Sequence, residues 1–279
     1  MRPVTKLGVF GNPIEHSLSP RIHALFAQAR QDHVEYQRYL TTPARFSKSV
    51  ADFFVNGGQG ANVTLPFKQQ AAERVTQLTD RARLAGAVNT LIAGKSGQLL
   101  GDNTDGEGLV FDLKNKRFKV SGRSLALFGA GGSARGILPL LLAQQPKCLY
   151  LINRTAEKAL ALKSELTELG LAETNRVQVL SSASEIEEPV ELVINATSSS
   201  LMGQALTLPG RLADDACGYD LMYANKPTLF MNQLSQAGCK KVSDGLGMLV
   251  EQAASSYQLW MGGERPDTTS VMSKLRKPI

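Results

Sequence analysis

Residues 124–134 read SLALFGAGGSA, a short apolar segment that runs directly into a glycine-rich turn. Gly129, Gly131 and Ala134 occupy the three small-residue positions of the Gly-x-Gly-x-x-Gly/Ala fingerprint of dinucleotide-binding folds. There the first glycine makes a tight turn, the second lets the backbone approach a pyrophosphate, and the third position allows close helix–strand packing. Because a strand-like segment precedes the turn and a helical pattern follows it, we expect a phosphate site at the helix N-terminus. The alternative is a purely structural strand-to-helix turn.

The end of the next predicted strand indicates which dinucleotide binds. Asn153, Arg154 and Thr155 follow that strand, and Lys158 lies one helical turn later. NAD-binding folds carry an acid at this point, which accepts hydrogen bonds from the adenosine ribose. A carboxylate would repel a 2'-phosphate, whereas a guanidinium and a hydroxyl would bind it. We therefore predict NADP as the cofactor rather than NAD.

Strand-like and helical segments alternate along the whole chain, which is typical of α/β folds built on parallel sheets. In the first part we expect strands at 7–10, 34–40, 60–64, 87–93 and 98–100, and helices at 19–30, 45–56 and 68–79. Ser19 is predicted to cap the first of these helices, with Pro20 as its first residue. In the second part we expect strands at 124–128, 148–152, 177–180, 192–196, 216–220 and 240–243. Helices are predicted at 106–113, from the glycine turn to 144, at 155–169 and at 246–261.

The length of 279 residues fits two domains at roughly 150 residues each. We place the boundary at the polar turn and basic connector that follow residue 101. The prediction is an N-terminal α/β substrate domain of residues 1–105, completed by the C-terminal helix of residues 245–279. Residues 106–244 are expected to form a Rossmann-like, doubly wound NADP-binding domain, with the active site in the cleft between the domains.

The composition excludes several classes of protein. Hydrophobic residues make up 43% of the chain and charged residues 20%, which is ordinary for a globular protein. The longest apolar stretch, residues 137–143, contains Pro139 and is far shorter than the roughly 20 residues of a membrane helix. Cys148, Cys217 and Cys239 are an odd number without a Cys-x-x-Cys pair, so neither a disulfide framework nor a zinc cage is indicated. With no apolar signal core at the N-terminus, a cytoplasmic location is predicted.

The charge balance raises the question of a nucleic-acid partner. There are 31 basic and 25 acidic residues, a net charge of +6, which fits either a polynucleotide or an anionic small molecule. The basic residues gather at Lys114, Lys116, Arg117, Lys119 and Arg123, and again at Lys274, Arg276 and Lys277. We interpret the first group as a solvated connector and the second as a frayed tail. Since no zinc-finger, RNP or Gly-x-x-Gly motif accompanies them, we predict no nucleic-acid partner.

Two serines near the N-terminus are candidates for binding an anion. Ser17 and Ser19 flank Leu18 in a segment that we expect to be extended, so their hydroxyls would point the same way. A helix N-terminus follows, which favours anions. The pair therefore outlines a carboxylate cradle. The alternative is that Ser19 is only a helix cap.

Polar residues also follow a predicted strand in residues 62–68, which read NVTLPFK. Asn62 and Thr64 lie on one face of that strand, and Lys68 lies in the loop beyond Pro66, where α/β folds bind ligands. A lysine at a helix start is disfavoured by the helix dipole, so Lys68 needs another reason to be there. The alternatives are a merely solvated lysine and, for Asn89 at the end of a similar segment, a turn.

The acidic turn at residues 101–106, GDNTDG, resembles a calcium loop at first sight. An EF-hand loop starting at Asp102 would need suitable residues at four further positions. It fails at all of them: Thr104, Gly106, Glu107 and Leu113. The turn is therefore interpreted as carrying an Asp that could pair with Lys68.

The histidines and a run of serines are also candidates for a site. His16, His23 and His33 show no spacing typical of metal ligands, so we predict no metal site. Ser198–Ser200 lack the Gly-x-Ser-x-Gly elbow of a hydrolase, so we predict that they belong to a loop on the cofactor side, near Thr197.

Taken together, these motifs resemble the shikimate dehydrogenase family over nearly the whole chain, from Leu7 to Trp260. The motifs of the first half are Gly11-Asn12-Pro13-Ile14, His16-Ser17-Leu18-Ser19-Pro20, Asn62-Val63-Thr64-Leu65-Pro66-Phe67-Lys68, Gly86-Ala87-Val88-Asn89-Thr90 and Asn103-Thr104-Asp105-Gly106. Those of the second half are Gly129-Ala130-Gly131-Gly132, Asn153-Arg154-Thr155, Asn195-Ala196-Thr197-Ser198, Tyr219-Asp220-Leu221-x-Tyr223 and Asp244-Gly245-Leu246-Gly247-Met248. They occur in the order that the family has.

The family reduces 3-dehydroshikimate to shikimate with NADPH, on the route to chorismate and the aromatic amino acids. The resemblance implies that Ser17 and Ser19 hold the substrate carboxylate. It implies that Lys68, as general acid and base, and Asp105 form the catalytic pair, with Asp105 also hydrogen-bonded to the substrate. Contacts to the ring and its hydroxyls are implied for Thr64, Asn89, Tyr223 and Gln252, with Asn62 as a further contact.

The same resemblance implies which residues bind NADP. The phosphate positions match Gly129, Ala130, Gly131, Gly132 and Ser133, and the ribose positions match Asn153, Arg154, Thr155 and Lys158. Thr197, Leu221 and Gly245 are implied on the cofactor side, the last two near the nicotinamide. Asp80 aligns with an acidic position sometimes assigned to the cofactor.

Three features bear on specificity. Leu221 stands where methionine is commoner, a change that packing tolerates. Ser19 in place of threonine and Arg154 both favour the biosynthetic, NADP-dependent enzyme. The alternatives are a quinate/shikimate dehydrogenase and a non-catalytic, ligand-sensing homologue. The predicted partner is a small molecule, and the chain is expected to be a monomer or a homodimer.

Overall fold

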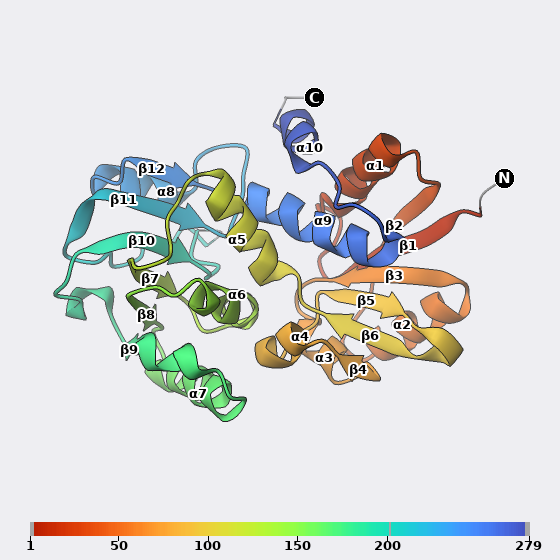
Figure 1. The fold of residues 1–279 in the computed structure, drawn as a ribbon, viewed down its shortest axis with the longest axis horizontal. Coiled ribbons are helices and arrows are strands. Elements are labelled where there is room, and N and C mark those ends of the chain that lie inside the picture. Colours follow the sequence, from red (N-terminus) through yellow and green to blue (C-terminus); the bar gives the residue numbers. More distant parts are fainter. Residues whose placement is uncertain (1–2, 201, 277–279) are drawn as a thin grey trace. The chain divides into compact units, whose positions relative to one another are not determined.

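The computed structural model describes residues 3–200 and 202–276, and these fold as two compact α/β units (Figure 1). The first unit contains the described residues up to Gly108 together with those from Val250 onward, and the second contains residues 109–249. The helix between residues 105 and 115 and the helix between residues 246 and 261 each contribute to both units. Two α/β domains, each built on its own sheet, confirm the predicted fold class.

The first unit is built on a mixed sheet of six strands in the order β2-β1-β3-β5-β6-β4. Strand β1 is parallel to its neighbours β2 and β3, whereas β5 is antiparallel to both of its neighbours, β3 and β6. Its strands are β1 (Thr5–Gly11), β2 (Val34–Leu40), β3 (Gly58–Val63), β4 (Gln77–Leu78), β5 (Thr90–Ala93) and β6 (Leu99–Asp102). Its helices are α1 (Ser19–Arg30), α2 (Phe46–Val55), α3 (Lys68–Ala72), α4 (Asp80–Ala85) and α10 (Thr268–Leu275), with the ends of α5 (Asp105–Asn115) and α9 (Leu246–Met261).

A cluster of aromatic rings holds α2 on this sheet. Phe46, Val50 and Phe53 recur at helical spacing on one face of α2 and are buried. Phe46 and Phe53 both meet Phe10 of β1 edge-on, with ring centroids 6.2 and 5.7 Å away. Phe67 stacks on Phe46 with centroids 4.8 Å apart and is itself buried. Because Phe67 is anchored in the core, the residue after it begins α3 at a fixed place.

The second unit is built on a parallel sheet of six strands in the order β12-β11-β10-β7-β8-β9. This is the doubly wound order of the Rossmann fold, in which the order reverses at the first strand, here between β7 and β10. Its strands are β7 (Ser124–Phe128), β8 (Cys148–Ile152), β9 (Val177–Leu180), β10 (Val190–Asn195), β11 (Leu212–Asp220) and β12 (Lys241–Ser243). Its own helices are α6 (Gly132–Ala143), α7 (Ala156–Glu168) and α8 (Leu229–Gln236). All five residues of β7 are buried, as expected for a strand covered on both faces.

Four local predictions were wrong. Leu18 is helical rather than extended, and the Ser19 hydroxyl does not cap α1, because the helix already includes Ser19. The helix predicted at 68–79 ends at Ala72, since the backbone N–H of Thr76 donates to Leu99 and starts strand pairing instead. Only Thr90–Ala93 of the strand predicted at 87–93 is a strand, and it runs antiparallel.

The basic segments also differ from the prediction. Residues 268–275 form α10, capped by the Asp267 carboxylate, rather than a frayed tail; Lys277 lies outside the described residues. In the connector, Arg123 is paired with Glu191 and Asp215 rather than solvated. Helices α4 and α8 were not predicted. Among the residues that the structure describes, no helix is long and apolar enough to span a membrane.

Candidate active site

A buried ion pair is the central feature of the first unit. Lys68 Nζ lies 2.6 Å from Asp105 Oδ2, and the two side chains are only 17% and 8% exposed. Lys68 is the first residue of α3, and Asp105 is the first residue of α5. A carboxylate is stabilised at a helix N-terminus, whereas an ammonium is not. The pair therefore places a lysine where only its acidic partner makes it favourable.

Asn89 fixes the orientation of the carboxylate. Its Nδ2 donates to Asp105 Oδ1 over 2.8 Å, so each oxygen of Asp105 has its own donor. The Oδ1 of Asn89 in turn accepts the backbone N–H of Thr104 over 2.9 Å. Asp105 is the partner of Lys68 Nζ among the described side chains, which leaves two of the three ammonium N–H groups for a bound molecule.

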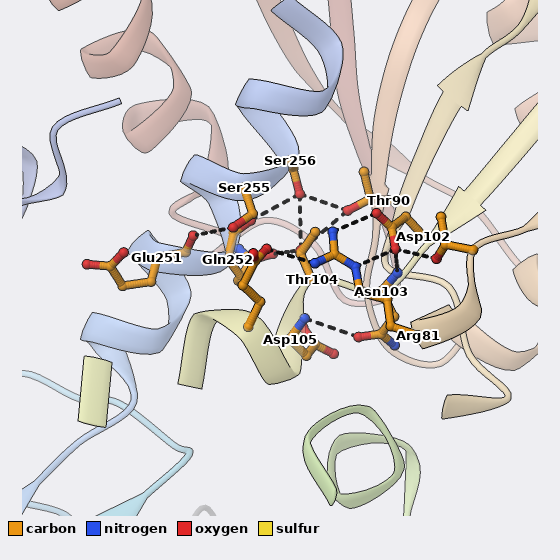
Figure 2. A network of polar contacts seen from close by, with 12 residues as sticks. Arg81, Thr90, Asp102, Asn103, Thr104, Asp105, Glu251, Gln252, Ser255 and Ser256 are labelled. Atoms are coloured by element: carbon orange, nitrogen blue, oxygen red, sulfur yellow. Dashed lines mark hydrogen bonds and ion pairs between the residues drawn. The ribbon is translucent and has the colours of Figure 1, made fainter. Parts of the chain in front are cut away.

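Behind this pair lies a layer of buried hydroxyl and amide groups (Figure 2). Ser256 of α9 lies 2.7 Å from Thr90 Oγ1 and 3.2 Å from Thr104 Oγ1. Gln252, one turn earlier on α9, accepts from Asn89 Nδ2 over 3.3 Å. Thr90, Thr104 and Ser256 were not singled out from the sequence. No sequence signal marks Ser256, because Thr90 and Thr104, whose hydroxyls it meets, precede it by more than 150 residues.

Asn62 points into the protein and belongs to this layer. Its Nδ2 donates to the Asn89 carbonyl and to Ser256 Oγ, both over 3.1 Å. Its Oδ1 accepts from the Tyr36 hydroxyl over 2.8 Å and lies 3.2 Å from Nε2 of His23. Burial lowers the pKa of His23 to about 3, so the ring is neutral and Nε2 is the donor. The amide of Asn62 is thus occupied by protein groups on both sides.

The two serines lie at the start of α1. Ser17 is half-buried, and its Oγ accepts the backbone N–H of Ser19 over 3.3 Å. Ser19 is buried beside Tyr36: burial raises the pKa of the Tyr36 hydroxyl, and the neighbouring Ser19 hydroxyl lowers it. Tyr36 also donates to Asn62, so the serines are connected to the layer behind Asp105. Thr64 follows β3, and its methyl group packs so tightly on Gly11 that a Cβ there would lie 2.5 Å away.

The glycine turn of the second unit has the geometry of a phosphate cradle. Gly129 has a φ of +107°, and a Cβ on it would lie 3.1 Å from Thr197 Cγ2, so both its backbone and its surroundings require glycine. Gly131 precedes α6, and a Cβ on it would meet no heavy atom within 4 Å. The first turn of α6, which includes Gly132 and Ser133, carries no acidic residue. The open backbone and the positive end of α6 fit a pyrophosphate.

Asn153 connects this turn to the basic loop after β8. Its Oδ1 accepts the backbone N–H of Ala130 over 3.2 Å, and its Nδ2 donates to the Thr155 carbonyl over 2.7 Å. Arg154, Thr155 and Lys158 are all exposed, and Thr155 directly precedes α7. Their charges and hydroxyl are therefore held at the carboxyl edge of the sheet and face solvent, as a 2'-phosphate site requires.

Three further cofactor candidates follow the neighbouring strands. Thr197 follows β10, and its Oγ1 donates to Asn195 Oδ1 over 2.6 Å. The backbone N–H of Leu221 donates to the Asn195 carbonyl, and a Cβ on Gly245 would lie 2.0 Å from the Leu221 carbonyl oxygen. These positions therefore form one packed group at the carboxyl edge, where doubly wound folds bind dinucleotides.

Tyr223 and Asp80 are the remaining predicted positions. Tyr223 follows β11 in the second unit and is half-buried, and this burial raises the pKa of its hydroxyl. Asp80 begins α4 in the first unit, where its side chain is 89% exposed and pairs with Arg83. Within the described ranges, no three His, Cys, Asp or Glu side chains are grouped as a metal site.

Comparison with known proteins identifies the family. The model of the shikimate dehydrogenase substrate binding domain matches residues 9–91. The model of shikimate/quinate 5-dehydrogenase matches residues 112–203, and that of the shikimate 5'-dehydrogenase C-terminal domain matches residues 245–276. The chain is 73% identical over 278 residues to the shikimate dehydrogenase (NADP(+)) of Idiomarina loihiensis, with 100% of both chains covered. The chain belongs to the shikimate dehydrogenase family.

Solved structures agree with this assignment. An Ael1 enzyme from Pseudomonas putida is 36% identical, with a TM-score of 0.89 over 98% of this chain and 99% of that one. A shikimate 5-dehydrogenase from Thermus thermophilus, solved with NADP(H) and shikimate, is 29% identical, with a TM-score of 0.84 over 98% of both chains. The family resemblance predicted from the motifs is therefore confirmed.

Proposed function

We propose that this protein catalyses the reversible, NADPH-dependent reduction of 3-dehydroshikimate to shikimate, a step toward chorismate and the aromatic amino acids. The observation that carries the proposal is the buried Lys68–Asp105 pair, held by Asn89 in the unit that matches the family's substrate-binding domain. The close full-length relative is named for the same NADP-dependent activity.

Lys68 is the general acid of the reduction and the general base of the reverse reaction. When bound, NADPH supplies a hydride to the ring carbonyl, whose oxygen then needs a proton. The Lys68 ammonium stabilises negative charge on that oxygen and donates the proton. Asp105 holds the ammonium by one N–H, so the remaining donors keep a defined direction. The intact pair argues against a non-catalytic sensor.

The substrate is recognised by polar groups of the first unit. Ser17 and Ser19 bind its carboxylate next to the N-terminus of α1. Thr64, Asn89 and Gln252 bind the ring hydroxyls, with Tyr223 of the second unit. Asn62 supports the site indirectly by donating to the Asn89 carbonyl, because both ends of its own amide are already hydrogen-bonded to protein groups.

The second unit binds NADP. Gly129–Ser133 surround the pyrophosphate at the N-terminus of α6, and Arg154, Thr155 and Lys158 bind the 2'-phosphate, with Asn153 holding the loop in place. Thr197, Leu221 and Gly245 border the nicotinamide. Asp80 is the weakest candidate, because it is exposed in the first unit and paired with Arg83.

In this proposal, residues 1–105 with 245–279 act as the substrate domain and residues 106–244 as the NADP domain. A cytoplasmic location and a monomer or homodimer stay predictions.

A spectrophotometric assay tests this function directly. The purified chain is mixed with NADP+ and shikimate, and absorbance of NADPH is followed; quinate and NAD+ are tested in parallel. We expect NADPH to form from shikimate and turnover to be much slower with NAD+. Equal turnover of quinate would instead support the catabolic quinate/shikimate enzyme, and no turnover with any pair would support a sensor.

A further inference from the structure

Arg81 of α4 holds two carboxylates at once. Its Nε and Nη2 donate to the two oxygens of Asp102, each over 2.7 Å, and its Nη1 donates to Glu107 Oε2 over 2.8 Å. The Asp102 side chain is only 2% exposed. A bidentate guanidinium–carboxylate contact defines orientation as well as distance, which a lysine could not reproduce.

The two carboxylates lie on either side of Asp105 in the sequence. Asp102 is the last residue of β6, and Glu107 lies in the first turn of α5. The hydrogen bonds of Arg81 go to these flanking residues, and Asp105 binds Lys68 and Asn89 instead. Arg81 therefore anchors both ends of the segment that presents Asp105, without contacting the Asp105 carboxylate.

Hydrogen bonds continue from Asp102 to Asp105. Asp102 Oδ1 accepts the backbone N–H of Asn103 over 2.7 Å, and Asn103 Oδ1 accepts the backbone N–H of Asp105 over 3.1 Å. Burial raises the pKa of Asp102, but the hydrogen bonds from Arg81 and Thr79 outweigh it and hold the pKa below its usual value. The carboxylate thus stays ionised, and its contact with Arg81 persists at neutral pH.

We propose that Arg81 is a positioning residue for the reaction: its contacts with Asp102 and Glu107 place Asp105, and through Asp105 they place the Lys68 ammonium. This inference rests on the proposed function, since it concerns the same site. A misplacement of roughly 1 Å in such a site costs about 100-fold in rate. Arg81 acts mainly on kcat in this way and leaves the proposed NADP groups of the second unit unchanged.

The test compares Arg81→Ala with Arg83→Ala. Arg83 lies on the same short helix but is 61% exposed and pairs with the exposed Asp80, so it is a matched control. We expect kcat to fall about 100-fold in Arg81→Ala, with an unchanged KM for NADP+ and a small change in KM for shikimate. Arg81→Lys should recover only part of the loss. An unchanged kcat, or a rise in KM alone, would overturn the proposal.

A double variant shows whether Arg81 acts through Asp105. If it does, Arg81→Ala should cause little further loss in an Asp105→Asn background, because the group it positions has already lost its charge. Losses that multiply would contradict the proposal. Should Arg81→Ala fail to fold, Glu107→Gln replaces it: this change removes one arm of the contact and should lower kcat at unchanged KM for NADP+.

Hydrogen exchange supplies a readout that needs no turnover. The amides of residues 103–107 should exchange faster in Arg81→Ala than in Arg83→Ala or the unmodified protein, and equal exchange would count against the proposal. Failure of the proposed function and failure of this inference give different results. An unmodified protein that does not oxidise shikimate refutes the proposed function, whereas full activity in Arg81→Ala refutes only the role of Arg81.

Discussion

The two units hold their functional groups in opposite ways. In the first, Asp105 and Asn89 are buried, Lys68 is half-buried, and all three are joined by hydrogen bonds between different elements. In the second, the glycine turn offers open backbone, and Arg154 and Lys158 face solvent. Proton transfer depends steeply on position, so its groups need a rigid shell, whereas phosphate binding relies on backbone donors and mobile charges. The site residues of the first unit should therefore tolerate substitution far less.

The largest expected effect concerns the Lys68–Asp105 pair of the first unit. Lys68→Ala removes the proposed general acid and should lower kcat by about 100- to 10,000-fold. NADP affinity should barely change, because the proposed NADP groups belong to the second unit. Steady-state kinetics of shikimate oxidation and NADPH titration measure the two quantities. Near-normal turnover would show that the pair is not catalytic.

Arg154→Ala tests the exposed basic loop of the second unit. Loss of a charge-assisted hydrogen bond costs about 1.5–3 kcal/mol, which corresponds to about 10- to 100-fold weaker NADPH binding. NADH lacks the 2'-phosphate, so its binding should hardly change. Fluorescence titration with both cofactors measures the ratio, with Arg83→Ala as an exposed control in the other unit. Equal losses for both cofactors would show that Arg154 does not bind the 2'-phosphate.

The neutral His23 ring gives a prediction about pH. Its pKa of about 3 in the folded protein is below the ordinary value of 6.5, so the unfolded chain binds the proton more tightly. This contribution to the free energy of unfolding is complete above pH 6.5 and is lost as pH falls toward 3, at up to about 1.4 kcal/mol per pH unit. Urea unfolding between pH 4.5 and 7.5 measures the slope. His23→Gln should flatten it, and the same change at the exposed His33 should not.

The smallest effect concerns the layer behind the pair. Ser256→Ala removes hydrogen bonds to Thr90, Thr104 and Asn62 and should lower the free energy of unfolding by about 0.5–1.5 kcal/mol. Ser255→Ala is a suitable control, because that hydroxyl makes one longer bond to a backbone carbonyl. Denaturant unfolding of both variants gives the difference. If the two variants lower the free energy of unfolding by the same amount, the layer is not a connected network.

The second unit was the more predictable one. Strands β7, β8 and β9 have the predicted bounds, because each is a short apolar run between turn residues. In the first unit, the predicted helix at 68–79 and strand at 87–93 were wrong. There, pairing with strands far along the chain outweighed local propensity, as at Thr76, which bonds to Leu99.

Local patterns in the amino-acid sequence were enough to determine the Rossmann-like sheet, the glycine turn, the basic loop at Arg154 and the family. The glycine turn and the basic loop each depend on residues within one strand–turn–helix unit, where spacing alone sets the geometry. The sheet and the family follow from such local motifs occurring in a fixed order along the chain. Only the tertiary structure brought Arg81 to Asp102, Asn89 to Asp105 and Ser256 to Thr90. These contacts join residues from separate elements, and their partners are chosen by packing of the whole unit, which no local spacing encodes.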